Sequence, residues 1–273
     1  MTNSSGGAIA VLDSGIGGLT ALKVLRSLLP GEDLIYLGDT GRIPYGTRSR
    51  DTIARYTRGN LRFLAQFKVK ALLVACNTIS ATVLPEVCAG LPFPVQGLVD
   101  ETAGRAAQIT RNNRIGVIAT PATIRSGAYE YALAGVAPDA RVCAQPCSLL
   151  VPIVENGRFR PGDVVTETLV AEYLAPVKDF GADTLVMGCT HYPLLRPIIA
   201  QYMGEGVALV DSGAVGAETF AARLGDEGLL NGNREGGSEV FYVSDSTESF
   251  RSLASLFLER ELAAERVVQV EIE

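Results

Sequence analysis

Short apolar runs alternate with amphipathic stretches along the whole chain. The apolar runs have the length of buried strands, and the stretches between them carry apolar residues at the spacing of one helix face. We expect strands at residues 8–12, 34–37, 71–75, 114–119, 184–188 and 240–243, and helices at residues 19–29, 51–67 and 246–259. This alternation is typical of an α/β protein with mainly parallel sheets flanked by helices.

Two of the apolar runs resemble each other and end in the same way. Residues 71–75 lead into Cys76, residues 184–188 lead into Cys189, and small polar residues follow both cysteines. An earlier strand and loop precede each run at nearly the same interval. We interpret this as an internal duplication that gives two similar lobes, with chance alternation as the alternative.

The order of these segments predicts how the chain divides. We expect residues 1–98 together with 209–273 to form the first α/β lobe, and residues 99–208 to form the second. The C-terminal segment would then pack back on the first lobe. Ligands of α/β proteins bind outside the carboxyl ends of the strands, so the two cysteines would present their thiols to one ligand from opposite sides.

Composition excludes several classes of function. The chain has 273 residues and a formal net charge of −6, which argues against nucleic acid or a membrane surface as a partner. Its apolar runs are too short to span a bilayer, and residues 1–7 do not resemble a signal peptide. The five cysteines form no disulfide framework. We therefore expect a cytoplasmic protein with reduced thiols.

A glycine-rich turn occupies residues 13–18, between the first expected strand and helix. It begins with Asp13 and Ser14, and its backbone N–H groups favour an anion at the helix start. The turn lacks the Gly-Lys-Ser/Thr ending of a phosphate-binding loop and the glycine spacing of a dinucleotide fingerprint. It therefore favours a carboxylate ligand, although Asp and Ser are also ordinary helix caps.

Cys76 and Cys189 differ from the other cysteines because each precedes polar residues at an expected helix start. Such a position stabilises a thiolate. The alternative, a cysteine that acts as a small buried hydrophobe, suits Cys88, Cys143 and Cys147, which have no polar residues grouped around them.

His191, the only histidine, could relay a proton near Cys189, with a helix-capping role as the alternative. Asp13 would have the matching role near Cys76. Glu155 follows an apolar stretch and could orient His191, or it could be an ordinary surface glutamate. A metal site would need both cysteines, His191 and a carboxylate without any Cys-x-x-Cys spacing, so we expect no metal.

The lysines argue against pyridoxal phosphate. Lys23 lies within a helix, whereas Lys68, Lys70 and Lys178 stand just ahead of strands, at the sheet edge away from the expected ligand. None is placed to form a Schiff base. We expect no cofactor.

Four motifs together resemble the cofactor-independent aspartate/glutamate racemases, and within that family the glutamate racemases. The resemblance covers about residues 9–243, and its motifs are Asp13-Ser-Gly-Ile-Gly-Gly18, Gly38-Asp39 with Arg42-Ile-Pro-Tyr-Gly46, Cys76-Asn-Thr78 with Ser80-Ala81, and Gly188-Cys-Thr-His-Tyr-Pro193. Gly41 and Ile43 depart from the residues that many family members carry there. Only eight residues precede Ile9, so an N-terminal extension linked to activation by a cell-wall precursor is not expected.

The resemblance implies an active site in a cleft between two lobes, with one cysteine on each side of the α-carbon of glutamate. Cys76 would deprotonate D-glutamate with help from Asp13, and Cys189 would deprotonate L-glutamate with help from Glu155 and His191. The residues implied in substrate binding are Asp13, Ser14, Tyr45, Gly46, Asn77, Thr78, Thr120, Thr190 and His191. The resemblance also implies a homodimer and a role in supplying D-glutamate for peptidoglycan.

Three alternatives remain open at this point. A racemase for another small acidic amino acid, such as aspartate, shares the two-cysteine plan. A two-lobed amino-acid-binding protein would use the cleft without catalysis, but simple binding has no use for a thiol on each face. A thiol redox protein is disfavoured by the lack of a Cys-x-x-Cys motif.

Overall fold

The computed structural model describes residues 6–233 and 236–273, so part of the loop expected at residues 229–238 lies outside the described residues. The elements, in chain order, are β1 (Ala8–Asp13), α1 (Leu19–Leu28), β2 (Leu34–Gly38), η1 (Thr40–Arg42), η2 (Tyr45–Thr47), α2 (Arg50–Leu64), β3 (Val69–Val74), α3 (Asn77–Thr82), α4 (Leu84–Val87), β4 (Val95–Gln96), α5 (Val99–Ile109), β5 (Arg114–Ala119), α6 (Pro121–Arg125), α7 (Ala128–Val136), β6 (Arg141–Pro146), α8 (Leu150–Glu155), α9 (Val164–Asp179), β7 (Thr184–Gly188), η3 (Tyr192–Leu195), α10 (Arg196–Met203), β8 (Ala208–Asp211), α11 (Ser212–Asp226), β9 (Glu239–Val243), α12 (Thr247–Leu258), η4 (Ala264–Arg266) and β10 (Val267–Gln269).

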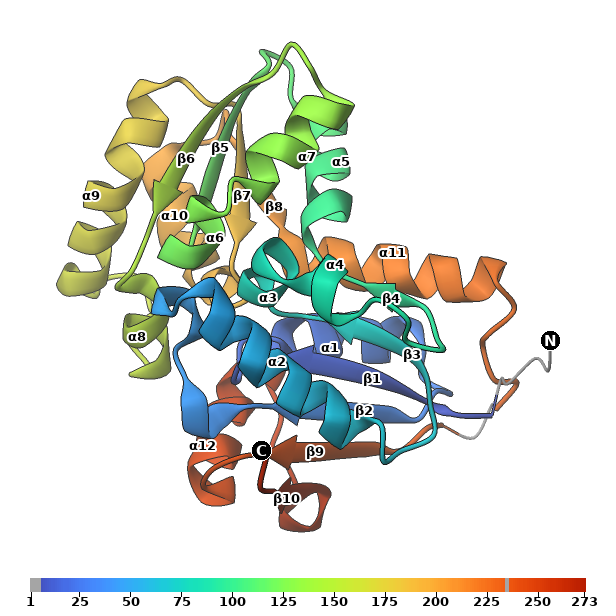
Figure 1. Cartoon of the computed structure of the whole chain (residues 1–273). Helices are drawn as coiled ribbons and strands as arrows, with labels where there is room; N and C mark the ends of the chain where they lie inside the picture. Colours follow the sequence, from blue (N-terminus) through green and yellow to red (C-terminus); the bar gives the residue numbers. More distant parts are fainter. Residues whose placement is uncertain (1–5, 234–235) are drawn as a thin grey trace.

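The strands of the described chain form two parallel sheets, each flanked by helices (Figure 1). One sheet has the order β10-β9-β2-β1-β3-β4, and the other has the order β6-β5-β7-β8. At the carboxyl edge of the first sheet Asp13 pairs with Gly38, and at the same edge of the second sheet Ala119 pairs with Gly188. The expected α/β fold with two mainly parallel sheets is confirmed.

The two sheets repeat one strand order. The order β2-β1-β3-β4 in the first sheet corresponds to β6-β5-β7-β8 in the second. Asp13 ends β1 and Ala119 ends its counterpart β5, while Cys76 follows β3 and Cys189 follows the counterpart β7. The recurrence seen in the sequence therefore extends to the topology of the fold.

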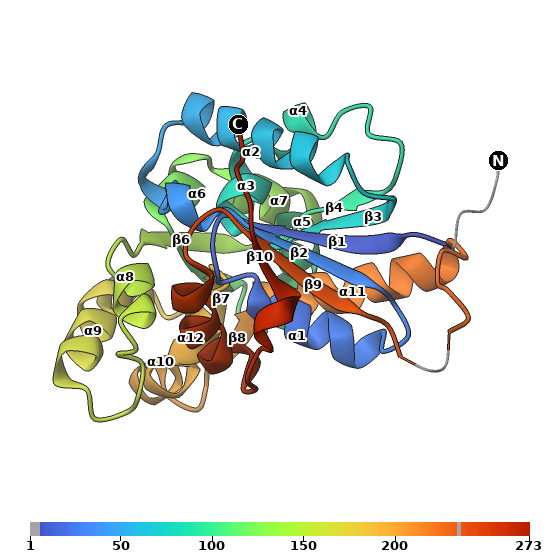
Figure 2. The same cartoon turned by 90° about the horizontal axis from the view of Figure 1, so that it is seen from below.

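The central strands are buried on both faces, which explains their continuous apolar sequence. In β1, Ile9 and Val11 pack in one hydrophobic cluster with apolar residues of α1, α11 and α12. The alternate residues Ala10 and Leu12 pack in another cluster with α2 and α3. Figure 2 shows α1, α11 and α12 on one side of the first sheet and α2 on the other.

The C-terminal segment returns to the first sheet, as expected, because β9 pairs with β2 and β10 pairs with β9. The N-cap expected for the last helix is also present, since the Ser246 side chain accepts a hydrogen bond from the Ser249 backbone N–H. Within the described residues, no helix combines the length and apolarity needed to cross a bilayer.

Two expectations need correction. The boundary predicted between residues 208 and 209 cuts through β8, which is tied to the second sheet by its pairing with β7. The division into lobes at that boundary otherwise stays a prediction. Lys70 lies inside β3 rather than ahead of it, and it forms a buried ion pair with Glu32 at 2.6 Å.

Candidate active site

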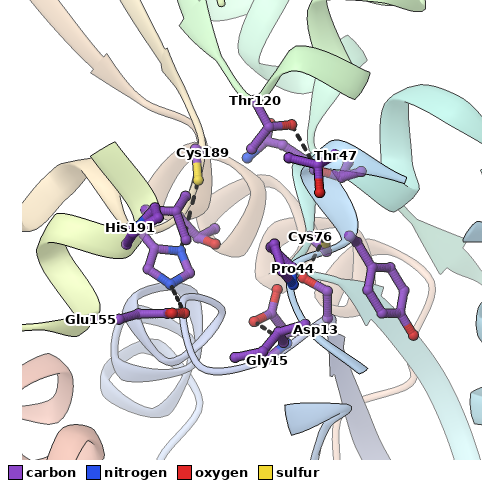
Figure 3. Close-up of a pocket in the computed structure, with 18 of the residues that line it drawn as sticks. Asp13, Gly15, Pro44, Thr47, Cys76, Thr120, Glu155, Cys189 and His191 are labelled. Atoms are coloured by element: carbon purple, nitrogen blue, oxygen red, sulfur yellow. Dashed lines mark hydrogen bonds and ion pairs between the residues drawn. The ribbon is translucent and has the colours of Figure 1, made fainter. Parts of the chain in front are cut away.

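A cavity lies where the carboxyl ends of the two sheets meet (Figure 3). Its walls are formed by the segments that directly follow β1, β2 and β3 of the first sheet and β5, β6 and β7 of the second. Every site residue expected from the sequence lines this cavity: Asp13, Ser14, Tyr45, Gly46, Cys76, Asn77, Thr78, Thr120, Glu155, Cys189, Thr190 and His191. The fold therefore brings together residues that are far apart in the chain.

Asp13 is the last residue of β1, and the glycine-rich turn wraps around its carboxylate. Its Oδ2 accepts hydrogen bonds from the Gly15 backbone N–H at 3.0 Å and from the Tyr36 hydroxyl at 3.4 Å. Burial raises the pKa of Asp13 above its ordinary value, while the charge of His191 and backbone N–H groups of the turn act in the opposite direction. These contacts hold the Asp13 carboxylate in one place.

Cys76 lies at the N-cap position of α3, on the same side of the cavity as Asp13 in Figure 3. Its thiol donates a hydrogen bond to the Ser14 hydroxyl at 3.3 Å. Burial, followed by the negative charge of Asp13, raises the pKa of the Cys76 thiol to about 12. Backbone N–H groups, including that of Ile79 in α3, act to lower the pKa of Cys76 as expected for a helix start, but burial and the charge of Asp13 outweigh them.

Cys189 stands on the other side of the cavity, at the end of a chain of ionisable groups. Its Sγ lies 3.8 Å from His191 Nδ1, and His191 Nε2 lies 3.0 Å from Glu155 Oε1. Glu155 is the last residue of α8, whereas the other two follow β7. Figure 3 shows the three side chains in line. The structure thus places Glu155 where it orients His191.

The charged form of His191 is stabilised by these two neighbours. Burial alone lowers the pKa of the imidazole, but the hydrogen bonds and negative charges of Cys189 and Glu155 outweigh burial and raise this pKa to about 10. A protonated imidazole thus lies beside Sγ of Cys189. The two cysteines therefore have unlike surroundings, a carboxylate on one side and an imidazolium on the other.

Close approach across the cavity requires glycine at two positions. A Cβ atom at Gly17 would lie 2.4 Å from His191 Nδ1 and 2.6 Å from Thr190 Oγ1. A Cβ atom at Gly46 would lie 2.6 Å from the Cβ of Thr120. The glycines of these loops thus allow a segment of the first sheet to pack against a segment of the second.

Three threonine hydroxyls lie close together, and two of them belong to Thr78 and Thr120, which line the cavity. Thr78 Oγ1 and Thr120 Oγ1 are 2.9 Å apart, and Thr120 Oγ1 is 3.0 Å from Thr123 Oγ1. Thr120 also caps α6 through the backbone N–H of Thr123. Since hydroxyls both donate and accept hydrogen bonds, this group suits the carboxylate or ammonium of an amino acid.

Two expected binding residues use their side chains for other contacts. Asn77 donates to the Ser212 hydroxyl at 2.8 Å and accepts from the Tyr129 hydroxyl at 2.5 Å. Tyr45 donates its hydroxyl to Asp39 and accepts from Asn60 at 3.2 Å. The hydroxyl of Tyr45 is therefore committed to Asp39 and Asn60, which leaves the ring and the backbone of this residue to line the cavity.

The sequence interpretation missed part of the cavity wall. Thr47, Ser148, Val151 and Pro152 line the cavity but were not expected there. Thr47 directly follows Gly46, so its place in the loop was the available signal. For the other three the available signal was their place shortly before Glu155 in the chain. Cys88, Cys143 and Cys147 pack in or against hydrophobic clusters outside the cavity, as expected for small buried hydrophobes.

The cavity does not have the arrangement of a metal centre. Across the part of the chain that the structure describes, no group of three or more His, Cys, Asp or Glu side chains is arranged to hold a metal ion. Its ionisable residues are instead distributed over two sides, each side with one thiol.

Comparisons with known proteins agree with this geometry. The sequence profile of the Asp/Glu/Hydantoin racemase family matches residues 20–220. The glutamate racemase of Geobacter metallireducens is 42% identical over 266 residues, which are 97% of this chain and 98% of that protein. The solved glutamate racemase from Bacillus anthracis has a TM-score of 0.92 at 35% identity, and the one from Francisella tularensis in complex with D-glutamate has 0.88 at 37%; each alignment covers 98% of both chains. The chain therefore belongs to the Asp/Glu/Hydantoin racemase family.

Proposed function

We propose that this amino-acid racemase is a glutamate racemase, which interconverts L- and D-glutamate without a cofactor and supplies D-glutamate for peptidoglycan. One observation carries the proposal. Cys76 and Cys189 follow corresponding strands of two matching sheets, line one cavity, and each have their own ionisable neighbours. The high identity to glutamate racemases supports glutamate as the substrate.

The two thiols would exchange protons with opposite faces of the substrate. When L-glutamate reacts, the Cys189 thiolate takes the α-proton as the Cα–H bond breaks, and the Cys76 thiol gives its proton to the other face. The reaction leaves Cys189 as a thiol and Cys76 as a thiolate, which is the state that reacts with D-glutamate. Because each base stays on its own side, the planar intermediate need not turn over.

The neighbours of each thiol fit these roles. His191 as an imidazolium stabilises the Cys189 thiolate, and Glu155 holds the imidazolium in place. The pKa of about 12 for Cys76 keeps this thiol protonated, ready to act as an acid toward L-glutamate. Asp13, which is close enough to raise that pKa by its charge, would accept a proton when Cys76 must become a thiolate.

The remaining polar residues of the cavity would hold the substrate. Hydroxyls of Ser14, Thr78, Thr120 and Thr190 and the backbone at Asn77, Tyr45 and Gly46 would bind the charged groups of glutamate. No arginine or lysine is among the described residues that line the cavity, so hydroxyl and N–H donors would have to carry this binding. Such fixed dipoles also stabilise the charge that develops as the α-proton leaves.

The proposal includes a homodimer and a cytoplasmic location, both supported by the resemblance to glutamate racemases. Sedimentation of the purified protein tests the first point. A mass twice that of the 28.9 kDa chain is expected, and a monomer at all concentrations would contradict it.

Racemisation itself is tested by incubating the purified protein with L-glutamate, and separately with L-aspartate, in a buffer that contains a thiol reductant. Circular dichroism should fall toward zero with glutamate and stay constant with aspartate. Loss of signal with aspartate alone would identify aspartate as the substrate in place of glutamate. Constant signals with both amino acids would reject the racemase function.

A further inference from the structure

We propose that helix α12 positions the proton-transfer groups of both cysteines through two phenylalanines, with Phe257 behind His191 and Phe250 behind the tyrosine that holds Asp13. This inference rests on the proposed function, because it assigns roles within the same two-thiol reaction. Neither residue lines the cavity, so both would act as positioning residues.

The two phenylalanines lie on one face of α12. They are separated by about two turns of an α-helix, which brings their side chains to the same side. Both are 3% exposed, and both belong to the same hydrophobic cluster. A single helix therefore presents two aromatic rings in the same direction.

Phe257 packs against the catalytic imidazole. Its ring lies 5.6 Å from the ring of His191, at an interplanar angle of 88°. Hydrogen bonds to Cys189 and Glu155 fix the two nitrogens of His191, but the ring can still tilt about the line that joins these partners. A perpendicular aromatic neighbour restricts this tilt, so Phe257 would keep Nδ1 directed at the sulfur of Cys189.

Phe250 supports the other half of the site through one intermediate residue. Its ring lies 6.1 Å from that of Tyr36, whose hydroxyl donates to the Gly15 carbonyl at 3.0 Å and approaches Asp13 Oδ2 at 3.4 Å. Asp13 in turn acts on Cys76 by its charge. Phe250 would therefore keep the Asp13 carboxylate in position beside Cys76.

The helix also lies close to the segment that carries Glu155. A second cavity is lined by Glu155 together with Phe250, Leu253 and Ser249 of α12, and both Figure 1 and Figure 2 show α12 beside α8. Because α12 follows β9 of the first sheet while His191 follows β7 of the second, the contact of Phe257 crosses between the two halves of the molecule. Helix α12 thus supports the ionisable neighbours of both cysteines.

The variants Phe257→Leu and Phe250→Leu test the proposal with opposite expectations. Enantiomers have equal free energy, so kcat/KM must fall equally in both directions, and we expect a loss of about tenfold in each variant. The kinetic isotope effect of α-deuterated substrate distinguishes the two variants. In Phe257→Leu, transfer at Cys189 slows, so the isotope effect of α-deuterated L-glutamate rises and that of D-glutamate falls. In Phe250→Leu, the isotope effects change in the reverse sense.

A readout that needs no activity accompanies the kinetics. His191 is the only histidine, so its ring-proton NMR signals can be followed directly. They should shift in Phe257→Leu and stay unchanged in Phe250→Leu. Leu256→Ala, at an exposed position of α12, serves as the control and should leave kcat, isotope effects and NMR signals unchanged. The milder changes Phe257→Met and Phe250→Met replace the leucine variants if those do not fold.

Equal changes of the two isotope effects in both phenylalanine variants would indicate a general structural role and would overturn the proposal. Unchanged isotope effects and an unchanged His191 spectrum would also overturn it. Failure of the proposed function is distinguishable from failure of this inference, because the unaltered protein would then show no racemisation of glutamate. The NMR comparison would still decide whether Phe257 holds His191.

Discussion

His191 Nε2 lies 3.0 Å from Glu155 Oε1. Glu155 ends α8, which follows β6, whereas His191 follows β7, so this contact joins two segments that follow different strands of the second sheet. The same imidazole faces the sulfur of Cys189 with its other nitrogen. The histidine is therefore fixed between Glu155, which favours its charged form, and the sulfur of Cys189.

Replacement of Glu155 by Gln should lower both the pKa of His191 and the activity. Burial disfavours the charged imidazole, and the hydrogen bonds to Cys189 and Glu155 outweigh it to give a pKa of about 10. In the native protein the imidazolium persists up to that pH, whereas in the variant it would be lost at lower pH. We expect kcat to fall about tenfold to hundredfold, and more steeply as the pH rises. NMR titration of the single histidine measures the pKa, and an unchanged value would contradict the account.

Serine at either Cys76 or Cys189 should abolish racemisation. A hydroxyl has a far higher pKa than a thiol and cannot supply the base at neutral pH, so we expect losses of at least about a thousandfold. Cys88→Ser is the matched control, because Cys88 is half-buried and lies outside the cavity. Circular dichroism of L- and D-glutamate monitors all three variants. Full activity of either cavity variant would refute the two-thiol mechanism.

Asp13→Asn should make the Cys76 thiol more acidic and the protein less active. Burial is the main cause of the raised pKa of Cys76, about 12, and the charge of Asp13 is the next. Loss of that charge should lower this pKa, and the thiolate would appear at lower pH. Activity should nevertheless fall about tenfold or more, because Asp13 no longer accepts a proton from the thiol.

Ultraviolet absorbance of the thiolate, compared between Asp13→Asn and a variant that also carries Cys76→Ser, gives the pKa. If the acidity of the thiol rose and activity rose with it, the role of Asp13 as a proton acceptor would be excluded.

Gly17→Ala should lower the activity because the new methyl group crowds the site, and not because the backbone requires glycine. The new Cβ would stand 2.4 Å from His191 Nδ1, so the imidazole would have to move. A displacement of this kind is expected to reduce kcat by more than about tenfold. Gly104→Ala is the control, since a Cβ atom there would meet open space outside its own helix and Gly104 is inside α5. That change should keep full activity and stabilise the fold by about 0.5–1 kcal/mol. Native activity in Gly17→Ala would show that the close approach is unnecessary.

Much of the fold was predictable because its signals are local. The expected strand at residues 8–12 became β1, and the glycine-rich turn after it leads into α1 as expected. Cys76 and Cys189 were recognisable because each follows a buried apolar strand, and parallel strands end at one edge. The assignment of Glu155 to His191 also agrees with the structure.

Other features depend on long-range packing and left no local signal. The expected boundary at residue 208 cuts through β8, because the pairing of β8 with β7 is decided by the sheet and not by the four residues of β8. The orientation of the Tyr45 hydroxyl depends on Asp39 and on Asn60 of α2. Likewise, the raised pKa of Cys76 comes mainly from burial, which only the assembled site provides.

The central claim, that two thiols act on opposite faces of one α-carbon, is tested most directly by racemisation of L-glutamate in D₂O. Mass spectrometry of the separated enantiomers, early in the reaction, measures deuterium at Cα. We expect deuterium in nearly all of the D-glutamate formed and little in the remaining L-glutamate, because the proton lost to Cys189 and the deuteron gained from Cys76 belong to different groups. Equal deuterium in both enantiomers from the start, or unlabelled product that retains the substrate's own proton, would contradict it.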